Sequence, residues 1–211
     1  MKVYLGRIIC MFIFFCCSAF FYGTIAPKQI LAEDEIPLSQ LESTVNRIID
    51  ILEEGDVEKE WEQQKQRIVP LIDERLNPEV IAQRSLGRHW RDISDEQREE
   101  FTSLFLQLLK DTYINRLRSY SVKSDARFYE QRKRGDRAIV YSIVRKDQQE
   151  VPIDYRLIRI DDEWRIYDIV VEGVSLISNY RKQFDQIMDR GGYPELINRL
   201  RDKIGTEPGA E

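Results

Sequence analysis

Acid–base or metal chemistry would have to be carried by very few residues of this chain. Its one histidine, His89, stands in the segment LGRHWRD, where a lone imidazole beside a tryptophan is more often a packing or surface residue than a catalytic one. All three cysteines, Cys10, Cys16 and Cys17, lie near the amino terminus. Zinc and copper sites of the usual type need more histidines or cysteines than this. The GxSxG, P-loop and GxGxxG motifs are also missing, so the sequence predicts no catalytic residue, no metal site and no enzyme.

Two aspartates stand in segments that are otherwise rich in apolar residues. Asp154 lies in VPIDYRL and Asp168 in WRIYDIV, so each could bring a carboxylate into the interior of a sheet. A buried carboxylate needs a partner, and Arg156, Arg165 and Arg181 are the nearby candidates. The pairing could contact a ligand, or it could fix the register of neighbouring strands. We favour the second interpretation.

The elements that position these residues follow from the spacing of the apolar side chains. Pro37 is expected in the first turn of a helix, Pro70 is expected to end or kink a polar one, and the capping box SDEQ at 94–97 begins a strongly amphipathic one. Gly191-Gly192 should separate the last two helices. Helices are predicted over 37–52, 58–69, 77–87, 94–120, 174–189 and 194–204.

After residue 120 the apolar period changes from 3.6 to 2, which is typical of strands. The short turn-like connections between these strands favour consecutive antiparallel hairpins. The sequence therefore predicts an α+β domain over 33–204, with a four-stranded antiparallel sheet and helices packed around it. The four strands are expected at 126–133, 137–146, 150–160 and 163–171.

The last of these strands has apolar residues on both faces. Strict alternation would put Ile166 and Val170 on one face and Tyr167, Ile169 and Val171 on the other. One face of such a strand is normally wet, so something must cover the second face. The Glu172-Gly173 pair that follows is expected to make the sharp exit from the strand into a helix.

The amino-terminal segment indicates export. Lys2 and Arg7 precede an uncharged run from Ile8 to Pro27, and small residues follow, which predicts a signal peptide over 1–32; an uncleaved membrane anchor is the alternative. Cleavage there leaves a chain without cysteine and with 29 basic against 37 acidic residues, a net charge of −8. This balance argues against a nucleic-acid partner. The tail 205–211 is expected to be disordered.

Three segments together resemble one protein family. These are the series LGRHW…S…Q…F…LF…LL…Y…L…Y over 86–120, the segment VPIDYRL, and the string WRIYDIVVEGVSLISNYRKQF over 164–184. In this order they resemble the MlaC family of periplasmic phospholipid carriers and its toluene-tolerance relatives. The resemblance covers roughly residues 37 to 204.

The resemblance implies a function for the apolar strand. In that family a twisted antiparallel sheet and its helices enclose an apolar pocket that holds the acyl chains of a phospholipid. The implied protein is periplasmic, carries lipid between the outer and inner membranes, supports outer-membrane lipid asymmetry, and needs no cofactor. Its implied partners are phospholipid, an outer-membrane lipoprotein–porin complex, and an inner-membrane ABC transporter with its lipid-binding subunit.

The sequence supplies apolar residues that could form the wall of such a pocket. Nine come from the sheet region and four from the helix after residue 94. The same residues could instead fill an ordinary close-packed core. A periplasmic chaperone whose groove binds protein and a small hydrolase-like α+β enzyme using His89 or Asp168 remain the alternatives. The predicted lipid-binding residues are Phe105, Leu109, Tyr113, Leu117, Tyr141, Ile143, Val151, Ile153, Tyr155, Leu157, Ile169, Val171 and Val174.

Overall fold

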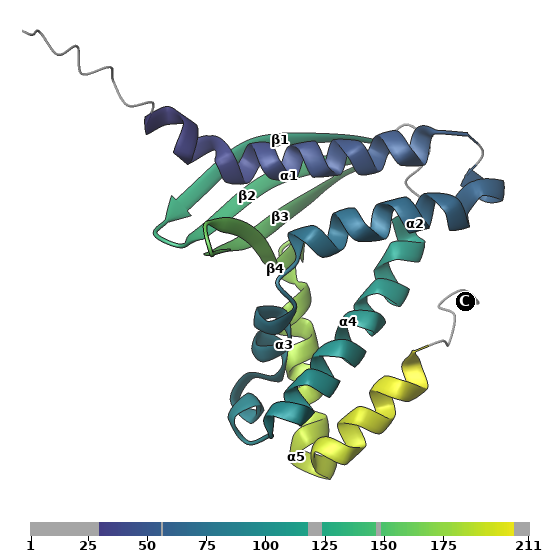
Figure 1. The fold of residues 1–211 in the computed structure, drawn as a ribbon, viewed down its shortest axis with the longest axis vertical. Helices are drawn as coiled ribbons and strands as arrows, with labels where there is room; N and C mark the ends of the chain where they lie inside the picture. Colours follow the sequence, from purple (N-terminus) through teal and green to yellow (C-terminus); the bar gives the residue numbers. More distant parts are fainter. Residues whose placement is uncertain (1–29, 56, 118–123, 147–148, 205–211) are drawn as a thin grey trace, which may run out of the picture. The chain divides into compact units, whose positions relative to one another are not determined.

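A computed structural model describes residues 30–204 with three gaps, at 56, 118–123 and 147–148 (Figure 1). Residues 1–29 of the predicted signal peptide (1–32) and the predicted tail lie outside these residues, whereas residues 30–32 belong to the first helix. Within them, no helix combines the length and the apolar character needed to cross a membrane. The helices are α1 (Ile30–Glu53), α2 (Val57–Arg75), α3 (Pro78–Leu86), the 3-10 helix η1 (Gly87–Arg91), α4 (Asp95–Leu117) and α5 (Leu176–Lys203).

The sheet confirms the predicted α+β class and adds one strand to the prediction. Its strands are antiparallel in the order β1-β2-β3-β4-β5, so that each pairs with its neighbour in the chain. The predicted sheet of four strands lacks β5, which is too short to leave a period in the sequence. The strands are β1 (Ser124–Arg134), β2 (Arg137–Lys146), β3 (Gln149–Ile160), β4 (Glu163–Val171) and β5 (Val174–Ser175).

The predicted turn at Glu172-Gly173 is a hairpin and not a direct exit into a helix. Both residues have positive φ, 50° at Glu172 and 80° at Gly173, and Val171 pairs with Val174 across them. Two consecutive residues with positive φ form the two-residue turn whose twist suits a hairpin. β5 therefore reverses the chain before α5 begins.

The predicted alternation along β4 is wrong because the strand contains a bulge. The pairing shifts between Arg156 and Leu157 of β3: Leu157 pairs with Ile166, whereas Arg156 pairs with Asp168. A bulge inserts one residue and so resets which face the following side chains occupy. Ile166 and Ile169 therefore pack in the same cluster, while Tyr167 packs in a different one.

Pro37, expected in the first turn of a helix, and Pro70, expected to end or kink one, both lie inside helices. Pro37 is in α1, which begins at Ile30, and Pro70 is in α2, which continues to Arg75. An internal proline removes one backbone hydrogen bond, which is a local cost that packing on either side can outweigh. The buried neighbours Ile68 and Leu71 keep α2 in contact with the rest of the domain across Pro70.

The predicted helix start at Asn77, the capping box at 94–97 and the glycine break are confirmed. Asn77 begins α3, where its side-chain oxygen accepts a hydrogen bond from the Val80 amide at 2.9 Å. In the capping box, the Ser94 amide donates to Gln97 Oε1 and the Gln97 amide donates to Ser94 Oγ. At the predicted glycine break, Gly192 leaves helical geometry (φ 66°, ψ −168°) and kinks α5.

Replacing Asn77 with alanine should lower the free energy of unfolding by about 1 kcal/mol, because the amide of Val80 then loses its capping partner. Urea unfolding monitored by circular dichroism measures this loss. Asn77→Asp keeps an acceptor at the same place and should lose less than half as much. Equal losses in the two variants would contradict the capping role.

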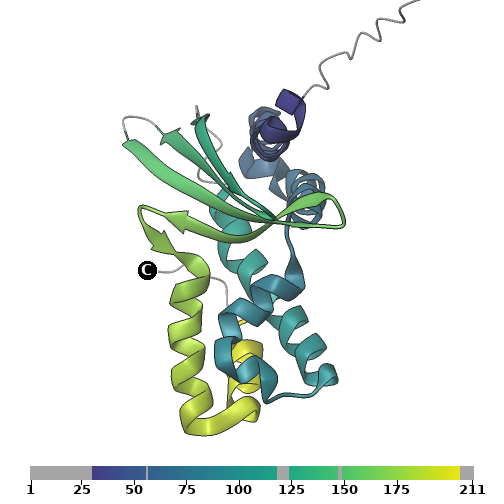
Figure 2. The same ribbon diagram turned by 90° about the vertical axis from the view of Figure 1, so that its left-hand side faces the viewer.

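The buried apolar side chains of the described residues form three clusters. Figure 2 shows α3, α4 and α5 gathered below the β4–β5 edge, with α1 and α2 to the side of the sheet. The first cluster joins α3, η1, α4 and α5 to Tyr167 of β4. The second joins α1 to one face of the sheet, and the third joins the carboxyl half of α1 to α2 and the end of α4. Leu76, directly after α2, is packed against both the first and the second cluster and so connects them.

Candidate lipid-binding site

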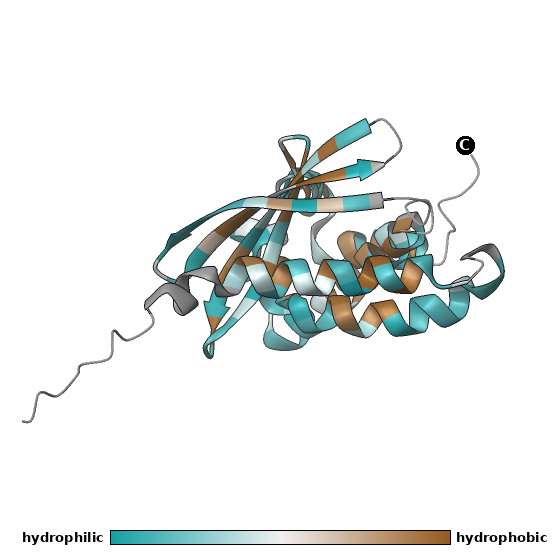
Figure 3. Cartoon of the chain, turned by 90° about the horizontal axis from the view of Figure 1, so that it is seen from above, coloured by the Kyte–Doolittle hydropathy of each residue, from teal (hydrophilic) through white to brown (hydrophobic). Residues whose placement is uncertain are grey.

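Seven of the thirteen predicted lipid-binding residues lie on the face of the sheet that packs against α1. The register fixes this: Tyr155 pairs with Ile169, Ile153 with Val171, and Val171 with Val174. Directly paired residues share a face, and residues two apart along a strand also share it. Figure 3 shows α1 running along the sheet, with apolar residues on both elements. The seven are Val151, Ile153, Tyr155, Leu157, Ile169, Val171 and Val174.

Burial decreases along this face. Leu157 is 3% exposed and Tyr155 9%, Ile153 is half-buried, and Val171 and Val174 are 39% and 63% exposed. Burial also raises the pKa of the Tyr155 phenol to about 12, since water no longer solvates the ionised form well. The apolar surface therefore continues past the part that protein covers. We call these seven side chains the α1-facing strip.

The residues of α1 that cover the buried part of this strip were not assigned to the site from the sequence. Leu41 is buried in the same cluster as Leu157, and Leu38 and Val45 are packed against it. Their helical spacing is visible in the sequence and correctly predicted the helix. The spacing does not indicate which face of the sheet the helix covers. The sequence therefore did not predict that α1 covers the strip.

Two predicted wall residues of β2 lie on the opposite face. Tyr141 pairs with Asp154 and Ile143 with Pro152, and these pairs alternate with the pairs of the α1-facing side. The ring of Tyr141 lies 6.3 Å from that of Tyr129, with the Arg132 guanidinium 5.5 Å from its centroid. Tyr141 and Ile143 are therefore separated by the sheet itself from the strip.

The predicted residues of α4 divide between two clusters. Phe105 is fully buried among aromatic rings, with centroids at 5.6 Å from Phe101, 5.0 Å from Tyr180 and 5.1 Å from Phe184. Protein side chains thus surround its ring. Leu109 and Tyr113 are partly buried at the margin of that cluster, whereas Leu117 is partly buried against the cluster of α1 and α2.

Asp168 holds the strand, the hairpin and the last helix together. The residue is 5% exposed. One oxygen of its carboxylate accepts hydrogen bonds from Arg156 Nη1 at 2.9 Å and from Ser175 Oγ at 2.7 Å. Its other oxygen accepts from the Ile177 amide in the first turn of α5 at 3.1 Å. Asp168 pairs directly with Arg156 across the sheet. The expected cross-strand pairing is confirmed for Asp168, with Arg156 rather than Arg165 or Arg181 as the partner, whereas no described residue forms an ion pair with Asp154.

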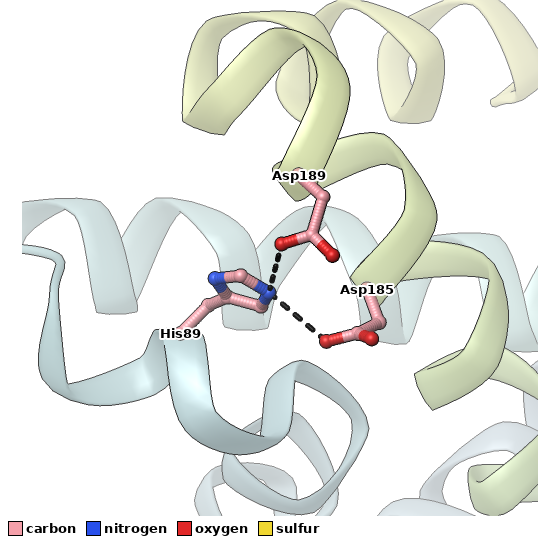
Figure 4. A group of neighbouring side chains, drawn as sticks. All are labelled: His89, Asp185 and Asp189. Carbon is pink, nitrogen blue, oxygen red and sulfur yellow. Dashed lines mark hydrogen bonds and ion pairs between the residues drawn. The ribbon is translucent and has the colours of Figure 1, made fainter.

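His89 lies against two aspartates of α5 (Figure 4). Its Nε2 atom is 3.1 Å from Asp185 Oδ1 and 3.7 Å from Asp189 Oδ1. Arg88 also contacts both carboxylates, with Nη2 at 2.6 Å from Asp189 Oδ1 and Nε at 3.2 Å from Asp185 Oδ1. The cluster therefore ties η1 to α5 through charged contacts.

The same cluster brings together one imidazole and two carboxylates at a separation that a metal ion could bridge. Their ligand atoms all lie within 4.8 Å of one another. The guanidinium of Arg88, however, already supplies positive charge to both carboxylates. A cation would have to displace it, so we interpret the group as an ion-pair cluster that anchors η1.

The comparisons with known proteins agree with the architecture. The family model described as "MlaC protein" matches residues 42–202. A curated relative from Haemophilus influenzae, the intermembrane phospholipid transport system binding protein MlaC, is 27% identical over 132 residues. The match covers 60% of this chain and 61% of that relative, so the chain spans about three fifths of the relative's length.

A solved structure shares the fold. It is the phospholipid-binding protein from Ralstonia solanacearum in complex with a phospholipid, with a TM-score of 0.68 and 24% identity, covering 78% of this chain and 94% of that one. The matched family region contains α2 to α4, all five strands and nearly all of α5. On this match, the chain belongs to the MlaC family.

Proposed function

We propose that this protein is a periplasmic phospholipid carrier that moves lipid between the outer and inner membranes. The observation that carries the proposal is the α1-facing strip, which remains apolar where protein no longer covers it, up to Val171 and Val174. Exposed large apolar side chains that continue a core face are typical of a surface that receives an apolar guest. The Haemophilus relative is named for phospholipid transport, and the Ralstonia neighbour was solved with a phospholipid.

The thirteen predicted residues do not contribute equally to this proposal. The strip supplies the wall, with Ile153 and Ile169 half-buried between its covered and uncovered parts. Leu117 could extend the wall from α4, since it is partly buried next to α1. Phe105 supports the wall from within a packed core, and Tyr141 and Ile143 lie across the sheet from it.

The free energy of burying acyl chains explains how a carrier without its own energy source would work. Burying one methylene group is worth about 0.8 kcal/mol, so two long acyl chains are worth on the order of 20 kcal/mol relative to water. Transfer of the same acyl chains from water into a bilayer is favourable by nearly the same free energy. Exchange between the strip and a membrane is then close to neutral, while loss of lipid into water is negligible. Direction must come from partners, for which we propose an outer-membrane lipoprotein–porin complex and an inner-membrane ABC transporter.

Transfer between vesicles tests this function. Donor vesicles containing a self-quenched fluorescent phospholipid should lose that lipid to acceptor vesicles faster when the protein is added, in proportion to protein concentration. A rate that does not depend on the protein, together with capture of unfolded peptide, would favour a chaperone.

Replacing His89 with alanine distinguishes the carrier from an enzyme. The variant loses the contact between His89 and Asp185, but the acyl chains do not require an imidazole, so the bound phospholipid per chain should stay within about 20% of wild type. Quantitative lipid mass spectrometry of both proteins provides the measurement. Hydrolysed lipid that accumulates with wild type and disappears with His89→Ala would contradict the carrier and support hydrolysis.

A further inference from the structure

A cavity of about 620 Å³ lies away from the α1-facing strip and has a different chemical character. It lies between α3, η1, the ends of β2 and β3, and α5, and none of the thirteen predicted lipid-binding residues lines it. Among the described residues that do line it there is no aspartate or glutamate. Its charged side chains are all arginines: Arg84, Arg88, Arg91, Arg137 and Arg181.

Two of these arginines are held in place by uncharged groups. The Arg84 guanidinium lies 4.1 Å from the centre of the Tyr167 ring, which stacks against it without cancelling its charge. Arg181 donates from Nε to the carbonyl oxygen of Arg84 at 2.6 Å. Both side chains are therefore held by uncharged groups, and neither charge is neutralised by these contacts.

Two further arginines lack a carboxylate partner among the described residues. Neither Arg91 nor Arg137 forms an ion pair with an aspartate or glutamate in that part of the chain. Arg88 differs, since Asp185 and Asp189 neutralise it. Four positive charges without a described carboxylate partner thus line one solvent-open cavity in a protein whose net charge is −5.

The backbone at the cavity is shaped to let these side chains converge. Gly87 has a φ of +62° between α3 and η1, and a Cβ atom there would lie 3.4 Å from Arg181 Cδ. Glycine therefore permits both the turn and the close passage of the Arg181 side chain. Val80 and Ile158 add an apolar flank to the cavity.

We propose that this arginine cavity binds a phosphate group carried by a small organic ligand. Guanidinium groups bind phosphate through paired hydrogen bonds, and a cavity of this volume is of the size that holds a small ligand rather than a single ion. The phosphate could belong to a phospholipid head group at a bilayer surface or to a soluble glycerophosphate. This site is additional to the apolar strip and does not depend on acyl-chain binding there.

Calorimetric titration of the purified protein with sn-glycerol 3-phosphate at low ionic strength tests the proposal. The variant R91A/R137A should bind at least about tenfold more weakly, the loss expected for one charge-assisted hydrogen bond. The matched control R127A/R145A removes the same charge from exposed positions of β1 and β2 outside the cavity. The control should bind glycerol 3-phosphate with an affinity within about twofold of wild type. Equal weakening in both variants would overturn the proposal.

Flotation with vesicles distinguishes the two sources of phosphate. If phosphatidylglycerol vesicles recruit wild type and the control but not R91A/R137A, while glycerol 3-phosphate binds weakly, the site binds phosphate in head groups at a membrane. If glycerol 3-phosphate binds and the vesicles do not, the ligand is soluble. Binding of neither, or binding of an oligoglutamate peptide alone, would overturn the proposal. Lipid mass spectrometry of R91A/R137A should still detect a full phospholipid load, so failure here and failure of the carrier function are separate results.

Discussion

Replacing Val171 with aspartate is expected to reduce the phospholipid bound per chain to less than about one tenth of the wild-type amount. Val171 is 39% exposed at the uncovered part of the α1-facing strip, so the fold does not depend on its complete burial. A carboxylate facing acyl chains would lose its water, and an unpaired buried charge costs several kcal/mol. Lipid mass spectrometry of the folded, monodisperse variant measures the effect.

Ile160→Asp is the matched control for this experiment. Ile160 lies on β3 of the same sheet and is 36% exposed, close to the value for Val171, but it pairs with Glu163 at the far end of β4. Its substitution introduces the same charge at the same degree of exposure outside the strip. Its lipid content should equal that of wild type. If Val171→Asp also keeps a full lipid load, the strip is not the wall that contacts lipid.

The second large effect concerns stability. Asp168→Ala should lower the free energy of unfolding by about 3 kcal/mol, since it removes the partner of Arg156 and the acceptor for Ser175 and the Ile177 amide together. The side chain of Arg156 is 39% exposed and can be solvated in the variant, which keeps the loss at the lower end of the range for buried pairs. Urea unfolding should move to a lower midpoint with an unchanged slope.

Asp154→Ala is the control for Asp168→Ala. Asp154 lies in the neighbouring strand β3 and is only half-buried, and no described residue forms an ion pair with it. Its loss should change stability by less than about 0.5 kcal/mol. Similar destabilisation in both variants would mean that the Asp168 contacts do not make the predicted contribution to stability.

Much of the fold could be predicted because local patterns determine it. The capping residues Asn77 and Ser94, the glycine break at Gly192 and the period of 2 in the strands each depend on neighbours in sequence. The continuation of α1 and α2 through Pro37 and Pro70 could not be predicted, because packing against distant elements outweighs the loss of one hydrogen bond.

The site was less predictable than the fold for a related reason. A single bulge opposite Arg156 and Leu157 changes which residues of β4 share a face, and no residue type in the sequence indicates its position. Tyr141 and Phe105 are apolar like the strip residues, yet one lies across the sheet and the other lies in an aromatic core. The four arginines without a described carboxylate partner come from four separate elements, so only the tertiary structure brings them together.

The most direct test of the carrier function is native mass spectrometry of the protein purified, without detergent, from the organism that makes it. The account predicts a mass increment of one phospholipid on nearly every chain, which extraction with organic solvent removes. Purified protein that carries no lipid, and takes none up from phospholipid vesicles, would contradict this prediction.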